Sequence, residues 1–323
     1  MIGNLQILRV FAASAVVIYH CNVYFFGNHT DFAGVAIFFA LSGYLMCRIK
    51  DKRSAGEFAV ERFWRIAPSY WLATAIVWFA FQPGVPIGHF ILTALFIPHD
   101  SIHGLFPMLG VGWTLNMEVY FYAVFALSIL INRRFSPVIA ACAILAIYAG
   151  LPLATDNKPA VFYYTHPYIL YFVSGIAVFY LSEWLATKLD AHRLPKAILP
   201  VTLAAYVLVV GIGLKDVNSP ALGLLIVSVM LMTAVMSGKL GADIRWRPLM
   251  TLADASYACY LVHTIVIEFL RHKHLNVDGS LGVTVMAFAL AWVVALGWHF
   301  WFEKRVVQTV RRGIVPSRQV ADA

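Results

Sequence analysis

Charged residues are scarce in this chain, and their scarcity excludes an ordinary water-soluble protein. Asp, Glu, Lys and Arg make up 12% of its 323 residues, whereas about 25% is usual for soluble domains. The charges that remain are mostly basic, and the net charge is +8. Because the basic residues form short clusters between apolar runs and no continuous stripe, we expect no nucleic-acid partner.

Cysteine is also scarce, and neither cysteine nor histidine follows a metal-binding pattern. The four cysteines are far apart, without a CxxC pair or a Cys/His group of zinc spacing. We interpret them as small core residues. The eleven histidines are scattered along the chain, so the sequence indicates no metal cofactor.

Long apolar runs account for most of the sequence, in which 61% of the residues are hydrophobic. A helix of about 20 apolar residues crosses a bilayer core, and lipid tolerates no unpaired backbone groups. We therefore predict an all-α integral membrane protein built as a bundle of about ten transmembrane helices. The predicted spans are 5–26, 32–48, 67–82, 112–131, 136–154, 163–181, 197–214, 220–237, 254–270 and 281–302.

Two shorter regions complete the predicted organisation. The apolar piece 88–97 is too short to cross a bilayer, and we expect a re-entrant or interfacial segment there. Residues 1–303 are predicted to form a single transmembrane domain. Residues 304–323 are predicted to be a basic cytoplasmic tail at the lipid surface.

The distribution of Lys and Arg orients the predicted bundle. With the amino terminus in the cytoplasm, 19 of the 24 basic residues fall on the cytoplasmic side and 4 on the outer side, while Arg9 lies inside the first span. Short cytoplasmic loops are enriched in Lys and Arg. We therefore expect both termini in the cytoplasm.

Ionisable residues within the predicted spans are few, and each costs about 2.5–3.5 kcal/mol to insert, so each is a candidate functional residue. They are Arg9, His20, Glu118, His263, Glu268 and His299. At 1.5 Å per residue, His20 lies roughly 22 Å from the inner end of its helix, and Glu118 about 9 Å from the outer end of its own. The two side chains can therefore share a level in the outer half of the membrane.

A histidine beside a carboxylate suits proton removal from a hydroxyl that attacks a carbonyl. We therefore predict that His20 is a catalytic base and Glu118 its orienting partner. A hydrogen bond that only ties two helices together would give the same pattern.

Three arginines are candidates for binding an anion. Arg62 and Arg65 lie three residues apart on a predicted cytoplasmic helix, so they face one side. Paired guanidinium groups suit phosphate. An anchor at the inner membrane surface is the alternative for this pair, and Arg9 could equally snorkel to the same surface.

Two polar patterns are weaker. Ser42 and Gly43 form a small notch in an aromatic helix, which is typical of close helix packing. Tyr257, Tyr260 and His263 recur at spacings of three, which places them on one helical face. That face could line a cavity or pack against another helix.

Six segments, taken in order, resemble the acyltransferase-3 family of membrane-bound acyltransferases, whose members O-acylate bacterial surface and exported glycans. They are LQILRVFAASAVVIYH (5–20), FFALSGY (38–44), ERFWRIAPSYW (61–71), GWTLNMEVYFY (112–122), SYACYLVH (256–263) and FEKRV (302–306). The likeness is greatest to the short exopolysaccharide acetyltransferases. Two positions depart from the pattern, because many members carry Asp where this chain has Gln6 and Pro where it has Lys304.

The resemblance implies that an acetyl or another short acyl group passes from acyl-CoA to a hydroxyl of a glycan or lipid-linked sugar. The expected donor is acetyl-CoA. It implies a catalytic His20 and Glu118, with coenzyme A held by Arg9, Arg62 and Arg65. The same motifs supply candidate substrate-binding residues, namely Ser42, Trp113, Tyr122, Tyr257, Tyr260 and His263.

The expected geometry is a tunnel that coenzyme A enters from the cytoplasm, past the arginines, to reach His20 nearer the outer face. His20 would act as a general base or carry the acyl group itself. A transporter or glycan flippase that uses His20, Glu118 and Arg9 is the alternative function. No internal inverted repeat of the kind common in transporters is found in the sequence.

Overall fold

A computed structural model of the chain shows an all-helical protein. The structure describes residues 2–27, 31–101, 104–189, 194–211, 220–273, 281–306 and 308–309. Within these ranges the only extended pairing is a single bridge between Ser101 and Gly104. The prediction of an all-α protein is therefore confirmed.

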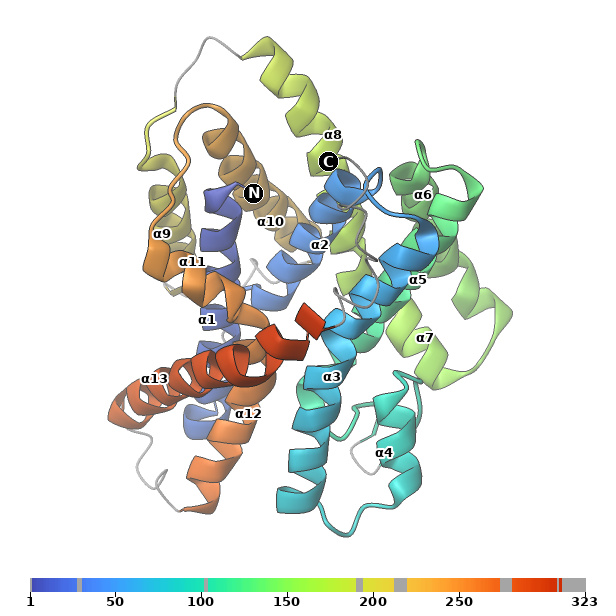
Figure 1. Ribbon diagram of the computed structural model, residues 1–323, viewed down its shortest axis with the longest axis vertical. Helices are drawn as coiled ribbons and strands as arrows, with labels where there is room; N and C mark the ends of the chain where they lie inside the picture. The colour runs from blue at the N-terminus through green and yellow to red at the C-terminus, as the bar shows by residue number, and fades with distance from the viewer. Residues whose placement is uncertain are drawn as a thin grey trace, which may run out of the picture.

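Thirteen α-helices are present in the described part of the chain (Figure 1). They are α1 (Gly3–Phe26), α2 (Gly34–Ile49), α3 (Ala55–Phe81), α4 (Ile87–Ala94), α5 (Trp113–Ile131), α6 (Ser136–Ala154), α7 (Lys158–Tyr164), α8 (Leu170–Lys188), α9 (Ile198–Gly211), α10 (Pro220–Lys239), α11 (Arg247–Asp254), α12 (Ser256–His272) and α13 (Leu281–Trp298). Short 3₁₀ turns η1 (Gly110–Gly112) and η2 (Pro167–Ile169) precede α5 and α8, and the π-helical turn η4 (His299–Glu303) follows α13.

Each of the ten predicted spans overlaps a helix, but the predicted count of about ten membrane spans is not confirmed. Six helical segments among the described residues are long and apolar enough to cross a bilayer. A seventh is added if the pair α11 and α12, bent by 63°, counts as one. The helices α2 and α9 are apolar but have only 16 and 14 residues.

The remaining predictions have mixed outcomes. A short helix, α4, occupies part of the predicted re-entrant or interfacial piece. Cys21, Cys47 and Cys259 are buried as predicted, whereas Cys142 is exposed on α6, a helix with most of its surface outside the core. Apart from 304–306 and 308–309, the predicted tail lies outside the described residues.

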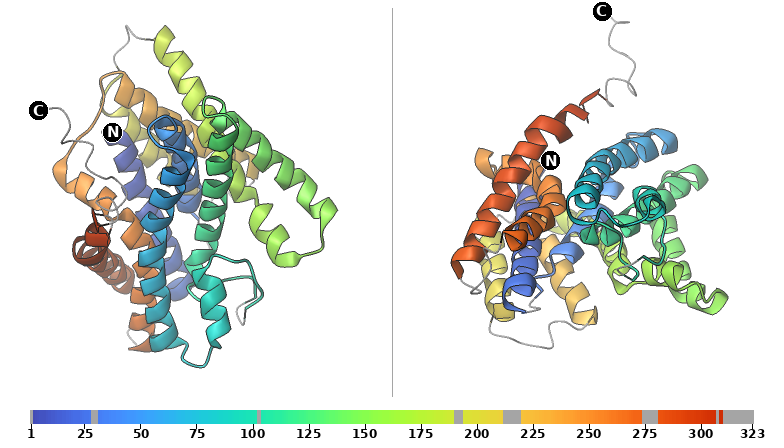
Figure 2. Two further views of the ribbon diagram at one scale, coloured as in Figure 1. Left: turned by 45° about the vertical axis from the view of Figure 1, so that its right-hand side comes forward. Right: turned by 90° about the horizontal axis from the view of Figure 1, so that it is seen from below.

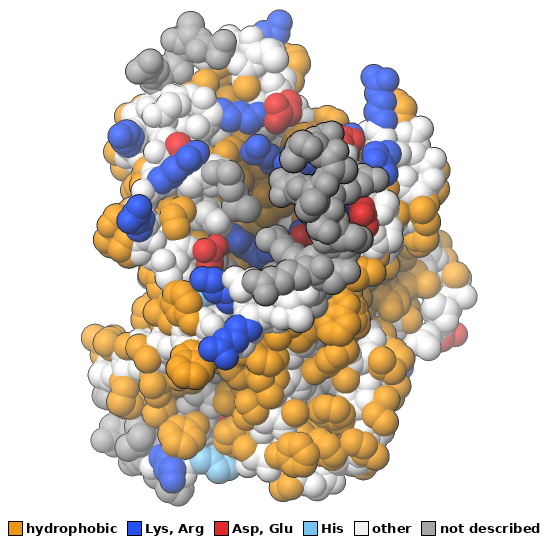
Figure 3. Space-filling model, viewed as in Figure 1, with side chains coloured by type: hydrophobic (Ala, Val, Ile, Leu, Met, Phe, Trp, Pro, Cys, Tyr) orange, Lys and Arg blue, Asp and Glu red, His pale blue; other side chains and the backbone are white. Residues whose placement is uncertain are grey.

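Basic side chains gather toward one end of the bundle. The start of α1, the connection from α2 to α3 and the end of α8 lie at the upper end in Figures 1 and 2, and α4 and the end of α12 lie at the lower end. On the face shown in Figure 3, most Lys and Arg side chains lie over the upper two thirds, and hydrophobic side chains cover most of the lower part. This asymmetry is what the positive-inside rule expects of a membrane protein.

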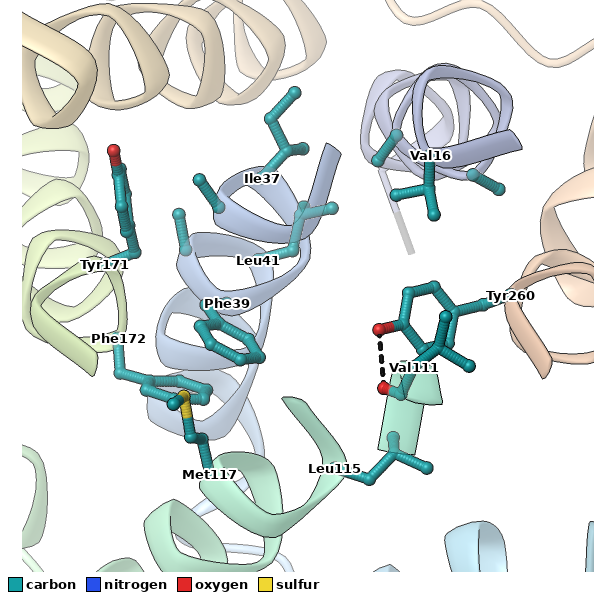
Figure 4. Packing of buried hydrophobic residues seen from close by; sticks show 14 of the residues in the cluster. Val16, Ile37, Phe39, Leu41, Val111, Leu115, Met117, Tyr171, Phe172 and Tyr260 are labelled. Carbon is teal, nitrogen blue, oxygen red and sulfur yellow. Dashed lines mark hydrogen bonds between the residues drawn. The ribbon is translucent and has the colours of Figure 1, made fainter. Parts of the chain in front are cut away.

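Helix α2 packs closely between α1 and α8 (Figure 4). A Cβ atom on Gly43 would clash with the backbone of Phe172, and one on Gly175 would clash with Ala40, so the two helices touch through paired glycines. Phe39 and Phe172 stack beside this contact with ring centroids 4.4 Å apart. Small residues allow such close approach where lipid supplies no hydrophobic driving force between helices.

The start of α3 is set by a capping box. The Ser54 side chain accepts a hydrogen bond from the backbone nitrogen of Glu57 at 3.2 Å, and the Glu57 carboxylate accepts one from the Ser54 nitrogen at 2.8 Å. This motif satisfies backbone donors at a helix start. Because α3 then runs unbroken to Phe81, Arg62 and Arg65 sit on a rigid helix rather than on a loop.

The glycine contact predicts a position-specific loss of stability. We expect Gly43→Leu to destabilise the fold by about 1–3 kcal/mol, because the added side chain overpacks the contact with Phe172. Gly150→Leu is the matched control, since Gly150 is an exposed helical glycine on α6 whose Cβ would meet no atom. The thermal unfolding midpoints in detergent measure the difference, and equal midpoints would contradict the packing argument.

Candidate active site

Two adjoining cavities share their arginines. The first has a volume of about 360 Å³ and lies among α1, α2, α3, α5 and α12. The second, of about 480 Å³, lies among α1, α3, α11 and the segment after α13. Arg9, Arg62 and Arg65 line both cavities. The structure therefore brings the three predicted arginines together at the junction, and Arg9 faces the cavities rather than the bilayer surface.

These arginines have few partners of opposite charge. None of the three forms an ion pair with a described carboxylate. Arg9 donates to Gln6 at 3.3 Å, and the buried Nε of Arg62 has no hydrogen-bond partner among the residues that the structure places. Buried guanidinium donors without an acceptor are costly unless a ligand satisfies them. The junction is therefore suited to an anionic ligand.

Close to Arg9, Gln6 is accompanied by an acidic residue far away in sequence. Gln6 and Asp254 both line the second cavity with Arg9. Arg9 interacts electrostatically with Asp254 as well as with Glu118. Asp254, at the end of α11, thus supplies negative charge near Arg9.

Glu118 projects from α5 into the first cavity. Its Oε1 accepts hydrogen bonds from the Ser42 hydroxyl at 3.1 Å and from the Tyr122 hydroxyl. Two of the predicted substrate-binding residues therefore hold this carboxylate in place. Both also line the cavity.

Two tyrosines of α12 close the inner wall of the same cavity. The Tyr257 hydroxyl donates to the carbonyl of Ile66 at 2.8 Å, and the Tyr260 hydroxyl lies 2.9 Å from the carbonyl of Val111 (Figure 4). Of the three residues expected on this helical face, Tyr257 and Tyr260 line the cavity, whereas His263 lines neither cavity. The hydrogen bonds fix both rings against neighbouring helices.

His20 has a different partner from the one predicted. Its Nδ1 lies 3.0 Å from the carbonyl of Val16 and 3.2 Å from Nε2 of His263. The predicted bond between His20 and Glu118 is wrong, because Glu118 bonds Ser42 and Tyr122 instead. The helical rise gave the depth of each residue but not the side of the helix that it faces. In the fold, α1 packs on α2 and α12, while α5 lies beyond α2.

The expected tunnel to His20 also differs. Neither His20, His263 nor Trp113 lines either cavity. The first cavity ends instead at Tyr260, whose ring centroid is 6.0 Å from that of His263. One layer of side chain thus separates the cavity from the histidine pair.

Trp113 belongs to an aromatic cluster outside the two cavities. Its ring centroid lies 5.1 Å from that of His166 and 5.8 Å from that of Tyr168. The Tyr168 hydroxyl donates to Asp31 at 3.1 Å, and Asp31 also accepts from the nitrogen of Ala33. Asp31 was not identified from the sequence, because it lies in a short connection between spans, where an acidic residue is unremarkable.

Asp31 supplies negative charge near His20. Burial raises the pKa of its carboxyl, while the hydrogen bonds from Tyr168 and Ala33 and the charge of His20 act in the opposite direction. The carboxylate that interacts electrostatically with His20 is therefore Asp31, in the α1–α2 connection, and not Glu118 on α5. The described residues contain no group of three or more His, Cys, Asp or Glu side chains that could hold a metal.

Comparison with known proteins places this site in a family. The model of the acyltransferase domain of the acyltransferase-3 family matches residues 2–302. The chain belongs to this family. It is an acyltransferase by family, with several apolar helices of membrane-spanning length.

Two curated relatives are similar over most of the chain. The exopolysaccharide production protein ExoZ of Rhizobium meliloti is 32% identical over 273 residues, which cover 80% of this chain and 84% of that protein. The putative peptidoglycan O-acetyltransferase YrhL of Bacillus subtilis is 28% identical over 312 residues, which cover 82% of this chain and 48% of that protein. No solved structure is significantly similar to the chain.

The environment of Asp31 predicts a dependence of stability on pH. Its pKa lies above the 3.8 of a free aspartate, so the folded state binds more protons than the unfolded state in the pH window that begins near that value. The contribution of Asp31 to stability should therefore fall as the pH rises through this window. Asp31→Asn keeps the acceptor for Tyr168 but cannot titrate.

We expect the unfolding midpoint of the wild type, relative to Asp31→Asn, to decrease as the pH is raised from 4. Thermal unfolding in detergent at a series of pH values measures it. The exposed Asp51, changed to Asn, is the control and should leave the profile of the wild type unaltered. A constant difference between wild type and Asp31→Asn would contradict the prediction.

Proposed function

We propose that this protein transfers an acetyl or other short acyl group from acyl-CoA to a hydroxyl of an exported or lipid-linked glycan. The observation that carries the proposal is the junction of the two cavities, which Arg9, Arg62 and Arg65 all line, and where the buried Nε of Arg62 has no hydrogen-bond partner among the described residues. Membership of the acyltransferase family supports group transfer. An exopolysaccharide protein and a putative peptidoglycan O-acetyltransferase among the relatives support a glycan acceptor.

The arginine junction is the donor site in this proposal. Arginine forms bidentate bonds with phosphate oxygens, and coenzyme A carries phosphates at one end of a long thioester arm. The second cavity would hold the nucleotide end, and the first would hold the arm, directed toward Tyr260. The orphan Nε of Arg62 gains an acceptor in this arrangement.

His20 moves the proton in the transfer step. It takes the proton of the acceptor hydroxyl as the oxygen forms a new C–O bond with the acyl carbon. The C–S bond of the thioester breaks, and His20 returns the proton to the coenzyme A thiolate. Tyr260 lies between the first cavity and His263 in this proposal. Its hydroxyl must therefore give up the bonds to Val111 and Thr114, and its ring must move aside, when the thioester arm binds.

Glu118 serves the donor side in this proposal. It shares the first cavity with Arg62 and Arg65, and two hydroxyl donors hold it there. It would keep the arginine side chains extended into the cavity through their mutual attraction. Ser42, Tyr122, Tyr257 and Tyr260 would shape the passage for the thioester arm.

The acceptor would approach from the other side of the histidine pair. Trp113, His166 and Tyr168 offer aromatic faces there, and Asp31 offers an acceptor for sugar hydroxyls. We place the arginines at the cytoplasmic side of a bacterial inner membrane, with ten spans and both termini in the cytoplasm. The gathering of basic side chains at one end of the bundle supports this orientation (Figure 3).

The decisive experiment uses the purified protein with labelled acetyl-CoA and glycan fragments. We expect label to appear on the glycan with the wild type and to be lost with His20→Ala, because alanine cannot take up the proton of the acceptor hydroxyl. His272→Ala, at the exposed end of α12, is the matched control and should keep full activity. Transfer that persists in His20→Ala would refute the role of His20, and ion-coupled glycan uptake without transfer would favour a transporter.

The arginines are tested separately through the donor concentration. We expect Arg62→Lys and Arg65→Lys each to raise the KM for acetyl-CoA about tenfold, because an ammonium group cannot replace the guanidinium fork. The kcat should change little. Arg134→Lys, an exposed arginine outside both cavities, is the control. An unchanged KM in Arg62→Lys and Arg65→Lys would contradict donor binding and would favour the alternative that these arginines anchor the helix at the membrane surface.

A further inference from the structure

The contacts of His20 and His263 determine which ring nitrogens carry a hydrogen. His263 on α12 is fully buried, at 0% exposure, and its Nδ1 lies 3.1 Å from the carbonyl of Cys259. A carbonyl only accepts hydrogen bonds, so Nδ1 of His263 must carry a hydrogen. A charged imidazole in this apolar core would be costly, and no described carboxylate bonds the ring. Its Nε2 is therefore an acceptor.

The same reasoning then fixes His20. Its Nδ1 faces two acceptors, the Val16 carbonyl at 3.0 Å and Nε2 of His263 at 3.2 Å. One hydrogen on Nδ1 of His20, shared between them, satisfies both contacts. In the neutral ring the other nitrogen, Nε2, then carries a lone pair. No residue in the described ranges forms a hydrogen bond with Nε2 of His20.

We propose that His263 is a positioning residue that holds the ring of His20 with Nδ1 protonated and presents Nε2 as the reacting nitrogen. This inference rests on the proposed function of His20. Nε2 is the reacting nitrogen whether His20 takes up a proton or carries an acyl group. When Nε2 takes a proton, the hydrogen bond from Nδ1 to His263 becomes charge-assisted and strengthens, so His263 stabilises the cation that forms in the reaction.

The hydrogen bond that Nδ1 of His20 donates to the Val16 carbonyl cannot fix the position of the imidazole ring by itself. Val16 precedes His20 by one turn of the same helix, so its carbonyl moves with the helix that carries His20. His263 comes from α12 and fixes the ring against a second element. The Tyr260 ring, on the same helix, lies at the end of the donor cavity. α12 thus links the position of the reacting nitrogen to the donor path.

The kinetic test compares two substitutions of His263 in the labelled-acetyl assay. His263→Leu keeps much of the volume but offers no acceptor, and we expect kcat to fall about 10- to 100-fold with the KM for acetyl-CoA unchanged. His263→Gln places an amide oxygen where it can accept from His20, and we expect it to recover most of the lost kcat. Wild-type kcat in His263→Leu would overturn the proposal. The proposal would also be overturned if His263→Leu and His263→Gln lost kcat equally while both unfolded at the same thermal midpoint as the wild type.

A spectroscopic test does not depend on activity. In protein labelled with ¹⁵N-histidine, the resonances of His20 are those absent from the His20→Ala spectrum. We expect a protonated Nδ1 and an unprotonated Nε2 for His20 at neutral pH, and the reverse assignment would overturn the proposal. If His20→Ala remained active, the function proposed for His20 would fail, while the ¹⁵N spectrum would still decide the hydrogen positions.

Discussion

The close approach of α2 to its neighbours is the constraint on which the site depends. Glycines at the crossing with α8 let two backbones touch, and Gly34 does the same beside Ala12 on α1. Because α2 is held between these helices, Ser42 reaches Glu118 on α5. The same position of α2 keeps α5 away from α1. Glu118 therefore lines the first cavity, whereas His20 contacts His263 outside it.

The polar residues divide into two groups that lie on opposite sides of Tyr260. On one side, the three arginines and Glu118 surround connected cavities with more cationic donors than carboxylate acceptors. On the other, His20 bonds His263 and lies near Asp31. Each group suits one half of a transfer reaction, namely binding a polyanionic donor and activating a hydroxyl. A side-chain boundary between the halves would also limit hydrolysis of the donor by water.

The comparisons and the geometry support each other at different levels of detail. The family match covers nearly the whole bundle and establishes acyl transfer as the class of chemistry. Gln6, Arg9 and Asp254 line one cavity, where Asp254 supplies negative charge near the arginine. Trp113 and Tyr168, which the proposed function assigns to the acceptor, line neither of the cavities that the arginines share.

The sequence by itself determined the all-helical class, the positions of the helices and the convergence of Arg62 and Arg65, because apolar run length and helical spacing are local properties. It could not show that His20 meets His263, 243 residues further along the chain, in place of Glu118. Depth in a membrane follows from counting residues, but the direction of a side chain around its helix depends on which helices are neighbours. Only the tertiary packing of α1 against α12, with α2 between α1 and α5, decided that pairing.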